Sequence, residues 1–503
     1  MKVKEKLISN TFYLFLNWFF LHLLSLIYWI FAAKNLLPSE YGIVATSFNL
    51  ASLLSGISIL GLNVAISKLV PEYIARKKLR KISVLIKKSF LLVFALNILI
   101  FISIFAASIA SPFLQTYFKL TLEIIVFSLI LMLISSFSKI FSSTIYGFQE
   151  MKKYFASNFL GRLTKVILAI FLVYLGLNYF GILIALLGES AVVCLSFLYL
   201  LLKKINLKVR ERIDFNHILK NFALPAFIAS LAQLLFSNSQ YILLTLIKNL
   251  EVTGIFALAM LLTSIITTFP TILNSALFPI TSFLSAFKDN KKQAYLINLV
   301  TRYSIFLTLP IAFLLSIFSK EVILIISKEA YLPASNLFPI LSISAIILGI
   351  GNVFLSNLYA IGKARINRNI VVLSSTSFLI FSIPLTFYFS SLGMSIAYFL
   401  SSSLLFSTSF FFIKRFLKIK FPIKDFIKCL VSALISFLLL YFLVKYTTRI
   451  WDYVLALLAC FFYLLILAIL KFYSKDDIEI LKFFARRIKF LESFVKFAEK
   501  FLD

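Results

Sequence analysis

Residues 68–110 read KLVPEYIARKKLRKISVLIKKSFLLVFALNILIFISIFAASIA, a loop crowded with basic residues followed by a long apolar run. Eight Lys or Arg residues lie between Lys68 and Lys88, and none lies between residues 89 and 110. A run of about 20 apolar residues is long enough to cross a bilayer as a helix. The stretch therefore predicts a membrane span with a basic loop at one end.

The same alternation continues along all 503 residues. Basic residues gather in every second connection between apolar runs, which holds 42 of the 50 Lys and Arg residues, against seven in the opposite connections. Cytosolic loops collect basic residues, so this distribution predicts a multi-pass protein of the cell membrane with both termini in the cytosol. We predict 14 spans, at 11–33, 41–66, 89–110, 120–143, 163–178, 180–202, 223–247, 252–278, 303–326, 335–360, 371–390, 392–413, 427–446 and 453–472.

Composition excludes several classes of function. The chain is 61% hydrophobic with a mean hydropathy of +1.01, whereas soluble chains are about 45–50% apolar. The net charge of +30 sits in short loops that face anionic lipid, so we expect no nucleic-acid partner. The three cysteines lie in apolar runs without CxxC or histidine partners, which predicts no metal site. Walker, GxSxG and HExxH motifs are absent from the sequence, so we expect neither a cofactor nor an enzyme.

An internal repeat relates the two halves of the chain. The sequence EYGIVA opens the second predicted span at residues 40–45, and VTGIFA opens the eighth at 252–257, an offset near 213 residues. Six spans per half is an even number, so the halves share one orientation and form a parallel repeat, a plan that secondary transporters use. We predict an all-α integral membrane protein with two six-helix lobes, at 1–210 and 211–422, and two extra helices at 423–474.

The last segment, residues 475–503, differs from the spans. Apolar residues recur there at helical spacing with basic residues between them. This pattern predicts an amphipathic helix on the cytosolic membrane surface, with a partner-binding helix as the alternative.

Polar side chains are costly in hydrocarbon, so their placement on the predicted helices is informative. Stripes of amides and hydroxyls follow spans 1, 2, 7 and 8, two pairs related by the repeat. They either bond neighbouring helices or line a water-accessible substrate cavity. The residues assigned to that cavity are His22, Ser25, Asn49, Ser52, Asn63, Lys139, Ser230, Gln233, Ser237, Gln240, Ser264, Thr267, Thr271 and Asn274.

Charged residues inside or beside the spans have two interpretations each. Lys139 interrupts span 4 and either reaches the interface or contacts an anion in the cavity. Glu189 lies near the middle of span 6, where it is protonated, paired or near water, and ion coupling is one role for it. Arg162 and Arg302 lie at the predicted cytosolic mouths of spans 5 and 9, as headgroup contacts or guides for an anionic substrate.

Several short motifs resemble one transporter family. They are LLPSEYG at 36–42, LGL at 60–62, PEY at 71–73, KEAYLPAS at 328–335 and AIGK at 360–363. Together they resemble the polysaccharide-transporter family (Wzx-like oligosaccharidyl-lipid flippases) of the multidrug/oligosaccharidyl-lipid/polysaccharide (MOP) flippase superfamily, over most of residues 8–420.

The resemblance implies a fourteen-helix flippase with a V-shaped cavity between two lobes that opens alternately to each side. Its substrate would be a polyprenyl-(pyro)phosphate-linked oligosaccharide moved from the cytosolic to the outer leaflet, and polysaccharide-assembly proteins would be partners. Many relatives carry charged residues in spans 1, 2, 7 and 8, whereas this chain has amides and hydroxyls there, which leaves Lys139 as the candidate cation. The alternatives are an exporter of drugs or other amphiphiles, a polyprenyl-dependent glycosyltransferase, and a scaffold for cell-wall assembly.

Overall fold

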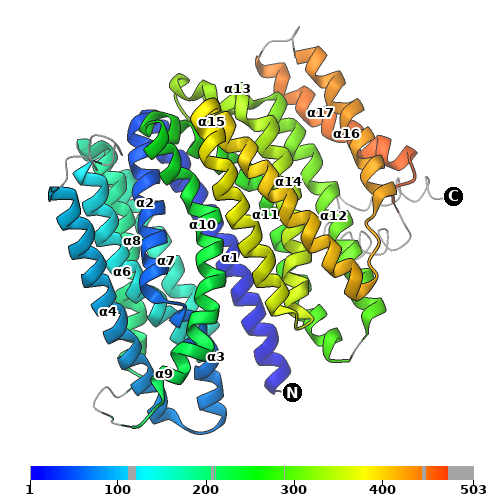
Figure 1. Cartoon of the computed structure of the whole chain (residues 1–503). Helices are drawn as coiled ribbons and strands as arrows, with labels where there is room; N and C mark the ends of the chain where they lie inside the picture. Colours follow the sequence, from blue (N-terminus) through cyan, green and yellow to red (C-terminus); the bar gives the residue numbers. More distant parts are fainter. Residues whose placement is uncertain are drawn as a thin grey trace. The chain divides into compact units, whose positions relative to one another are not determined.

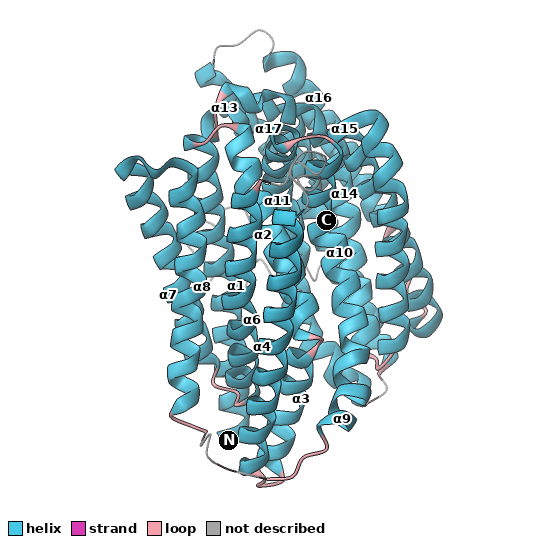
Figure 2. Ribbon diagram, turned by 60° about the vertical axis from the view of Figure 1, so that its left-hand side comes forward, coloured by secondary structure: helices cyan, strands magenta, loops and turns pink. Residues whose placement is uncertain are grey.

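Helices form throughout the described part of the chain (Figure 1). The computed structural model describes residues 2–110, 121–205, 209, 211–287, 289–444 and 449–473, and every regular element in these ranges is helical (Figure 2). Apolar segments in lipid must satisfy their backbone groups internally, and an α-helix does so within one segment. The prediction of an all-helical membrane protein is confirmed.

Ten helical segments in the described residues are long and apolar enough to cross a bilayer. Two of them contain a pair of predicted spans each. Residues 151–202 bend at Gly176 (φ 85°) and Asn178 (φ 41°), and residues 364–417 break at Ser390 (φ 55°). The ten segments therefore correspond to the first twelve predicted spans. The last two predicted spans correspond to α16 (Ile423–Val444) and α17 (Arg449–Ile469).

Two compact units make up the chain, and they are interleaved in the sequence. The first contains the residues up to Leu261 with Ile323–Leu337 and Arg368–Ser401, and the second contains Leu262–Val322, Phe338–Asn367 and the residues from Ser402. The division into sequential lobes at 1–210 and 211–422 stays a prediction. The first unit includes α1 (Lys2–Asn35), α2 (Pro38–Ile59), α3 (Leu62–Ala75), α4 (Leu79–Ala110), α6 (Leu122–Gly147), α7 (Met151–Leu172), α8 (Asn178–Leu202), α9 (Phe215–Ile218), α10 (Leu224–Ile247), the π-helical turns η1 (Val173–Leu177) and η2 (Leu219–Ala223), and the 3₁₀ helix η3 (Glu329–Leu337).

The second unit includes α12 (Asn290–Ile317), α14 (Phe338–Ala360), α16 and α17, while α11 (Leu250–Ala286), α13 (Ser319–Ile326) and α15 (Ala364–Leu417) contribute to both units. The predicted amphipathic helix at 475–503 lies outside the described residues.

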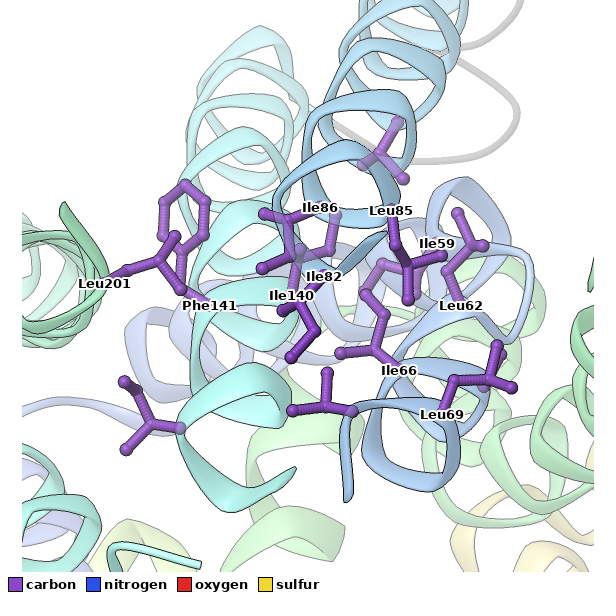
Figure 3. Packing of buried hydrophobic residues seen from close by; sticks show 14 of the residues in the cluster. Ile59, Leu62, Ile66, Leu69, Ile82, Leu85, Ile86, Ile140, Phe141 and Leu201 are labelled. Atoms are coloured by element: carbon purple, nitrogen blue, oxygen red, sulfur yellow. The ribbon is translucent and has the colours of Figure 1, made fainter. Parts of the chain in front are cut away.

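An apolar core occupies one end of the first unit, where α3, α4 and α6 meet (Figure 3). Just before α3, the backbone turns at Leu60 (φ 49°) and Gly61 (φ 73°). Glycine suits the second position twice over, because its φ is positive and a Cβ there would lie 2.3 Å from the Ala223 carbonyl oxygen. The span predicted at 41–66 was therefore too long for a single helix, because α2 ends at Ile59. The polar stripe that joined Asn49 to Asn63 does not continue across this turn into α3.

The first turns of α2 and α11 cross at backbone contact within the first unit. A Cβ on Gly42 would lie 1.9 Å from the Leu250 carbonyl oxygen, and a Cβ on Gly254 would lie 1.8 Å from the Pro38 carbonyl oxygen. One Cα hydrogen of each glycine therefore points at a carbonyl of the other helix, the geometry of weak Cα–H···O bonds. The two glycines belong to the motifs that the sequence paired as repeat partners, and at this crossing they have equivalent roles.

Candidate functional site

Lys139 lies on α6 and faces α2. Its Nζ donates to the Ser55 hydroxyl at 2.7 Å, and that hydroxyl donates to the Ser52 carbonyl at 2.9 Å. Farther along the same two helices, the hydroxyls of Ser58 and Ser136 lie 3.0 Å apart. Among the described residues, no carboxylate lies within ion-pair distance of Lys139. The bond to Ser55 uses one of the three donors of the ammonium group.

A second charged cluster joins α7 and α8. Glu189 accepts from Arg162 at 3.0 Å through Oε1 and from Lys165 at 2.9 Å through Oε2. The Lys165 side chain is only 1% exposed, and its Nζ also lies 4.5 Å from the centre of the Tyr28 ring on α1. The Tyr28 hydroxyl donates to the Ile182 carbonyl at 2.8 Å, which ties α1 to α8. Two cations therefore bracket one carboxylate.

This cluster bears on two predictions. Of the three states considered for Glu189, the structure shows the paired one. Arg162 lies inside α7, which begins at Met151 and not at residue 163, in the packed contact between α7 and α8, where it is three-quarters buried. Its place at a cytosolic mouth stays a prediction.

The remaining cavity candidates of the first unit differ in exposure. His22 is exposed, stacks on Trp18 and donates from Nδ1 to the Trp18 carbonyl at 2.8 Å. Asn49 and Gln240 are buried, and their amides donate to carbonyls of their own helices. The structure thus separates exposed polar residues from those that serve packing. Gln233 and Ser237 are exposed, and Ser25, Ser52, Asn63 and Ser230 are half-buried.

The second unit holds the α11 candidates. Ser264 and Thr271 are exposed, while Thr267 and Asn274 are half-buried. The Asn274 Oδ1 accepts from the Ser356 hydroxyl of α14 at 2.8 Å and lies 3.4 Å from the Asn357 amide nitrogen. Ser356 and Asn357 were absent from the sequence-based list, which took its residues from spans 1, 2, 7 and 8 and Lys139 of span 4. The packing of α14 on α11 brings them to Asn274.

Arg302 lies inside α12, which begins at Asn290, and its Nε is 3.6 Å from a carboxylate oxygen of Asp425 on α16. Its place at a cytosolic mouth stays a prediction. Its guanidinium also covers the Phe472 ring at 4.4 Å and donates to the Phe472 carbonyl. These contacts attach α16 and the end of α17 to α12.

A proline supports the same attachment. Pro310 lacks an N–H group, so the carbonyl four residues earlier, that of Phe306, loses its helical donor. The Tyr463 hydroxyl of α17 donates to that carbonyl at 3.0 Å. The two helices after residue 422 are therefore anchored to α12 by specific polar contacts.

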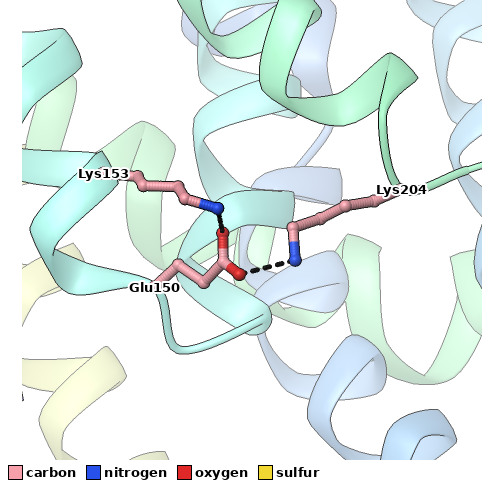
Figure 4. Close-up of polar contacts among 3 residues, drawn as sticks. All are labelled: Glu150, Lys153 and Lys204. Atoms are coloured by element: carbon pink, nitrogen blue, oxygen red, sulfur yellow. Dashed lines mark hydrogen bonds and ion pairs between the residues drawn. The ribbon is translucent and has the colours of Figure 1, made fainter.

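A charged trio closes the connection between α6 and α7 (Figure 4). Glu150 accepts from Lys204 at 2.6 Å and from Lys153 at 3.1 Å. Partial burial alone would raise the pKa of the Glu150 carboxyl, but the hydrogen bonds and charges of the two lysines lower that pKa below its usual value. This trio joins helix ends and lies apart from the Lys139 contacts.

The sequence pointed to Glu189 but not to its partner Lys165, nor to Tyr28, which Lys165 contacts. Lys165 follows Arg162 by three residues and so shares a helix face with it. That spacing, next to an acidic residue in the following span, was the available signal.

Known structures share this fold. A lipid II flippase, MurJ, in an inward closed conformation is 20% identical, with a TM-score of 0.72 over 91% of this chain and 98% of that one. An inward-facing multidrug resistance transporter of the MATE family, in the MOP superfamily, is 14% identical, with a TM-score of 0.68 over 79% of this chain and 94% of that one. These likenesses establish the MOP fold.

Sequence comparison extends the match. The uncharacterized membrane protein MJ1068 of Methanocaldococcus jannaschii is 24% identical over 449 residues, which cover 85% of this chain and 88% of that protein. The family model described as "Polysaccharide biosynthesis protein" matches residues 7–285, more than half of the chain. The chain therefore belongs to the polysaccharide biosynthesis protein family, and it is a multi-pass membrane protein with the MOP fold.

Proposed function

We propose that this membrane protein is a flippase that moves polyprenyl-(pyro)phosphate-linked oligosaccharide from the cytosolic to the outer leaflet by alternating access. Family membership and a fold shared with a lipid II flippase support this substrate class. The polyprenyl tail would stay in lipid while the sugars pass along polar side chains, which lowers the cost of moving hydroxyl groups through hydrocarbon.

Lys139 is the observation that carries the proposal. An ammonium group on a membrane helix is costly unless it is paired or functional, and no carboxylate of the described residues pairs with this one. Ser55 holds the side chain between α2 and α6 and leaves ammonium donors for a phosphate oxygen. We assign Lys139 the role of contacting the phosphate of the substrate.

The direction of transport follows from charge. With the basic loops in the cytosol, the inside-negative potential acts on an anionic headgroup with about 2.3 kcal/mol per charge per 100 mV, which favours outward movement. The contacts of Glu189 bear on the alternative of a coupled ion. An exchangeable cation would have to displace Arg162 or Lys165 from the carboxylate, so coupling through Glu189 requires that these ion pairs open during transport.

Flipping by Lys139 variants tests the proposal. Lys139→Met should slow the leaflet exchange of a fluorescent lipid-linked oligosaccharide in proteoliposomes by at least about tenfold, since a charge-assisted hydrogen bond is worth about 1.5–3 kcal/mol. Lys139→Arg should retain part of the rate, and Lys78→Met, which removes an exposed loop lysine, should retain all of it. Equal rates for wild type and Lys139→Met would remove Lys139 from the substrate path. Exchange of a cationic amphiphile in place of the oligosaccharide would favour the multidrug exporter instead.

A further inference from the structure

A row of hydroxyl groups runs along one face of α11 in the second unit. Thr267, Thr271 and Ser275 recur at intervals of four residues, so they share a helix face. Thr271 and Ser275 are exposed, and Thr267 is half-buried. Asn274, half-buried, follows the same face next to Ser275.

The hydrogen of each hydroxyl is already committed. Thr271 donates to the Thr267 carbonyl at 2.8 Å, Thr267 donates to the Ser264 carbonyl at 2.9 Å, and Ser275 donates to the Ile272 carbonyl at 2.7 Å. A hydroxyl has one donor and two acceptor lone pairs. The row therefore presents acceptors.

The orientation of the Asn274 amide is fixed by α14. The Val353 carbonyl accepts from the Asn357 amide nitrogen at 2.7 Å, so Asn357 presents its NH₂ group on this side. The same nitrogen and the Ser356 hydroxyl both approach one oxygen of Asn274, at 3.4 and 2.8 Å. Because the Asn357 amide nitrogen is a donor, the Asn274 atom that it approaches is the carbonyl oxygen, and the NH₂ group of Asn274 points away from α14.

Close packing keeps α14 in the position that this arrangement needs. A Cβ on Gly349 would lie 2.9 Å from the Pro270 ring, so the absence of a side chain lets α14 approach α11 one turn before Asn274. The amide is thereby held at a fixed place beside the hydroxyl row.

We propose that this face of α11 binds the sugar portion of the substrate and selects neutral sugars over acidic ones. The inference rests on the proposed flippase function and specifies its substrate. Sugar hydroxyls and acetamido N–H groups would donate to Thr271 and Ser275, and a hydroxyl or acetamido oxygen would accept from Asn274. A uronic acid carboxylate offers only acceptors, so it would leave the hydroxyl row without donors.

Binding to the purified full chain tests this selectivity. The ligands are farnesyl-pyrophosphate-linked N-acetylglucosamine and its glucuronic acid counterpart, and the expected result is at least about fivefold tighter binding of the neutral sugar, the worth of one net hydrogen bond. Asn274→Asp keeps the acceptor for Ser356 and Asn357 but removes the donor, so it should abolish this preference. Thr271→Val should weaken binding of the neutral sugar by about fivefold.

A matched control is Thr281→Val on the same helix. Its hydroxyl is buried and bonds only to carbonyls of its own helix, so the preference should be retained. Labelling of Thr271→Cys, with the native cysteines replaced, should proceed with a membrane-impermeant maleimide.

The outcomes separate this inference from the proposed function. Failure of the wild type to bind either ligand would overturn the flippase proposal itself. Binding that is weakened by Lys139→Met but unchanged by Asn274→Asp and Thr271→Val would overturn only the sugar site. Resistance of Thr271→Cys to the maleimide would place the face in lipid and would also overturn the sugar site.

Discussion

The backbone contact between α2 and α11 predicts that Gly254→Ala forces the two helices apart. The new Cβ would lie 1.8 Å from the Pro38 carbonyl oxygen and 3.0 Å from the Gly42 backbone nitrogen. Both atoms belong to the main chain, so no rotamer change relieves the overlap. The nearest distance must grow from 1.8 Å to at least 3.0 Å, which requires a shift of one whole helix end.

The cost of this shift has two parts. Overpacking costs about 1–3 kcal/mol, and each of the two Cα–H···O contacts contributes about 0.5–1 kcal/mol. We expect a total of about 2–5 kcal/mol against the crossed state, or a change of roughly 30-fold to 5,000-fold in its equilibrium with a separated state. Gly42→Ala should behave alike, and the double variant should cost little more than either single one, because one separation relieves both overlaps.

Disulfide cross-linking measures the crossing. Ser39→Cys and Glu251→Cys place exposed thiols on the first turns of the two helices, in a background without native cysteines. Oxidative cross-linking should slow strongly in both glycine variants. Gly188→Ala is the control, since the new Cβ there meets only a terminal methyl group of Leu168. Cross-linking of Gly254→Ala at the wild-type rate would refute this prediction. A double variant whose cost equals the sum of the two single costs would refute it as well.

Three further predictions concern the polar contacts. Glu189→Gln leaves two cations without a carboxylate, so it should destabilise the protein by about 3–5 kcal/mol, and adding Lys165→Met should recover part of the thermal stability in detergent. Tyr463→Phe should lower the stability of the protein by about 1 kcal/mol. The loss should be smaller in a Pro310→Ala background, where α12 regains its own donor to the Phe306 carbonyl. Equal losses of stability in both backgrounds would contradict this role of Tyr463 in anchoring α17. The lowered pKa of the Glu150 carboxyl contributes stability at pH values above its unfolded-state pKa of about 4.3, and this stability is lost as pH falls through the lowered pKa. Glu150→Gln should therefore flatten the acid side of a profile of stability against pH. An unchanged profile would show that the trio does not stabilise the protein.

The helices could be predicted because length and apolarity largely determine a membrane span. The span predicted at 180–202 is α8 (Asn178–Leu202), and the one predicted at 120–143 is α6 (Leu122–Gly147). Errors arose where helices continue beyond the apolar run, as α7 does back to Met151. The turn at Gly61 was missed because its flanks are as apolar as a helix interior.

The sequence identified single residues of the candidate site but not the contacts between them. Lys139 and Glu189 stood out because each is ionisable within an apolar run. Their partners depend on which faces of two helices meet, and this register is set by packing: Gly161, for instance, lies so close to Val193 that a Cβ would be 2.2 Å from its methyl carbon. No spacing within a single span encodes which face of another helix it meets, so the pairings of Lys165 with Glu189 and of Asn357 with Asn274 emerged only from the structure.

Leaflet exchange by the wild-type protein shows directly whether it moves a lipid-linked oligosaccharide across the bilayer. Proteoliposomes would carry a fluorescent lipid-linked oligosaccharide, and an impermeant quencher would report the fraction in the outer leaflet over time. We predict protein-dependent exchange that is faster for the pyrophosphate-linked oligosaccharide than for a phospholipid with the same label. Exchange no faster than in protein-free liposomes, for neutral and acidic sugars alike, would contradict the flippase proposal.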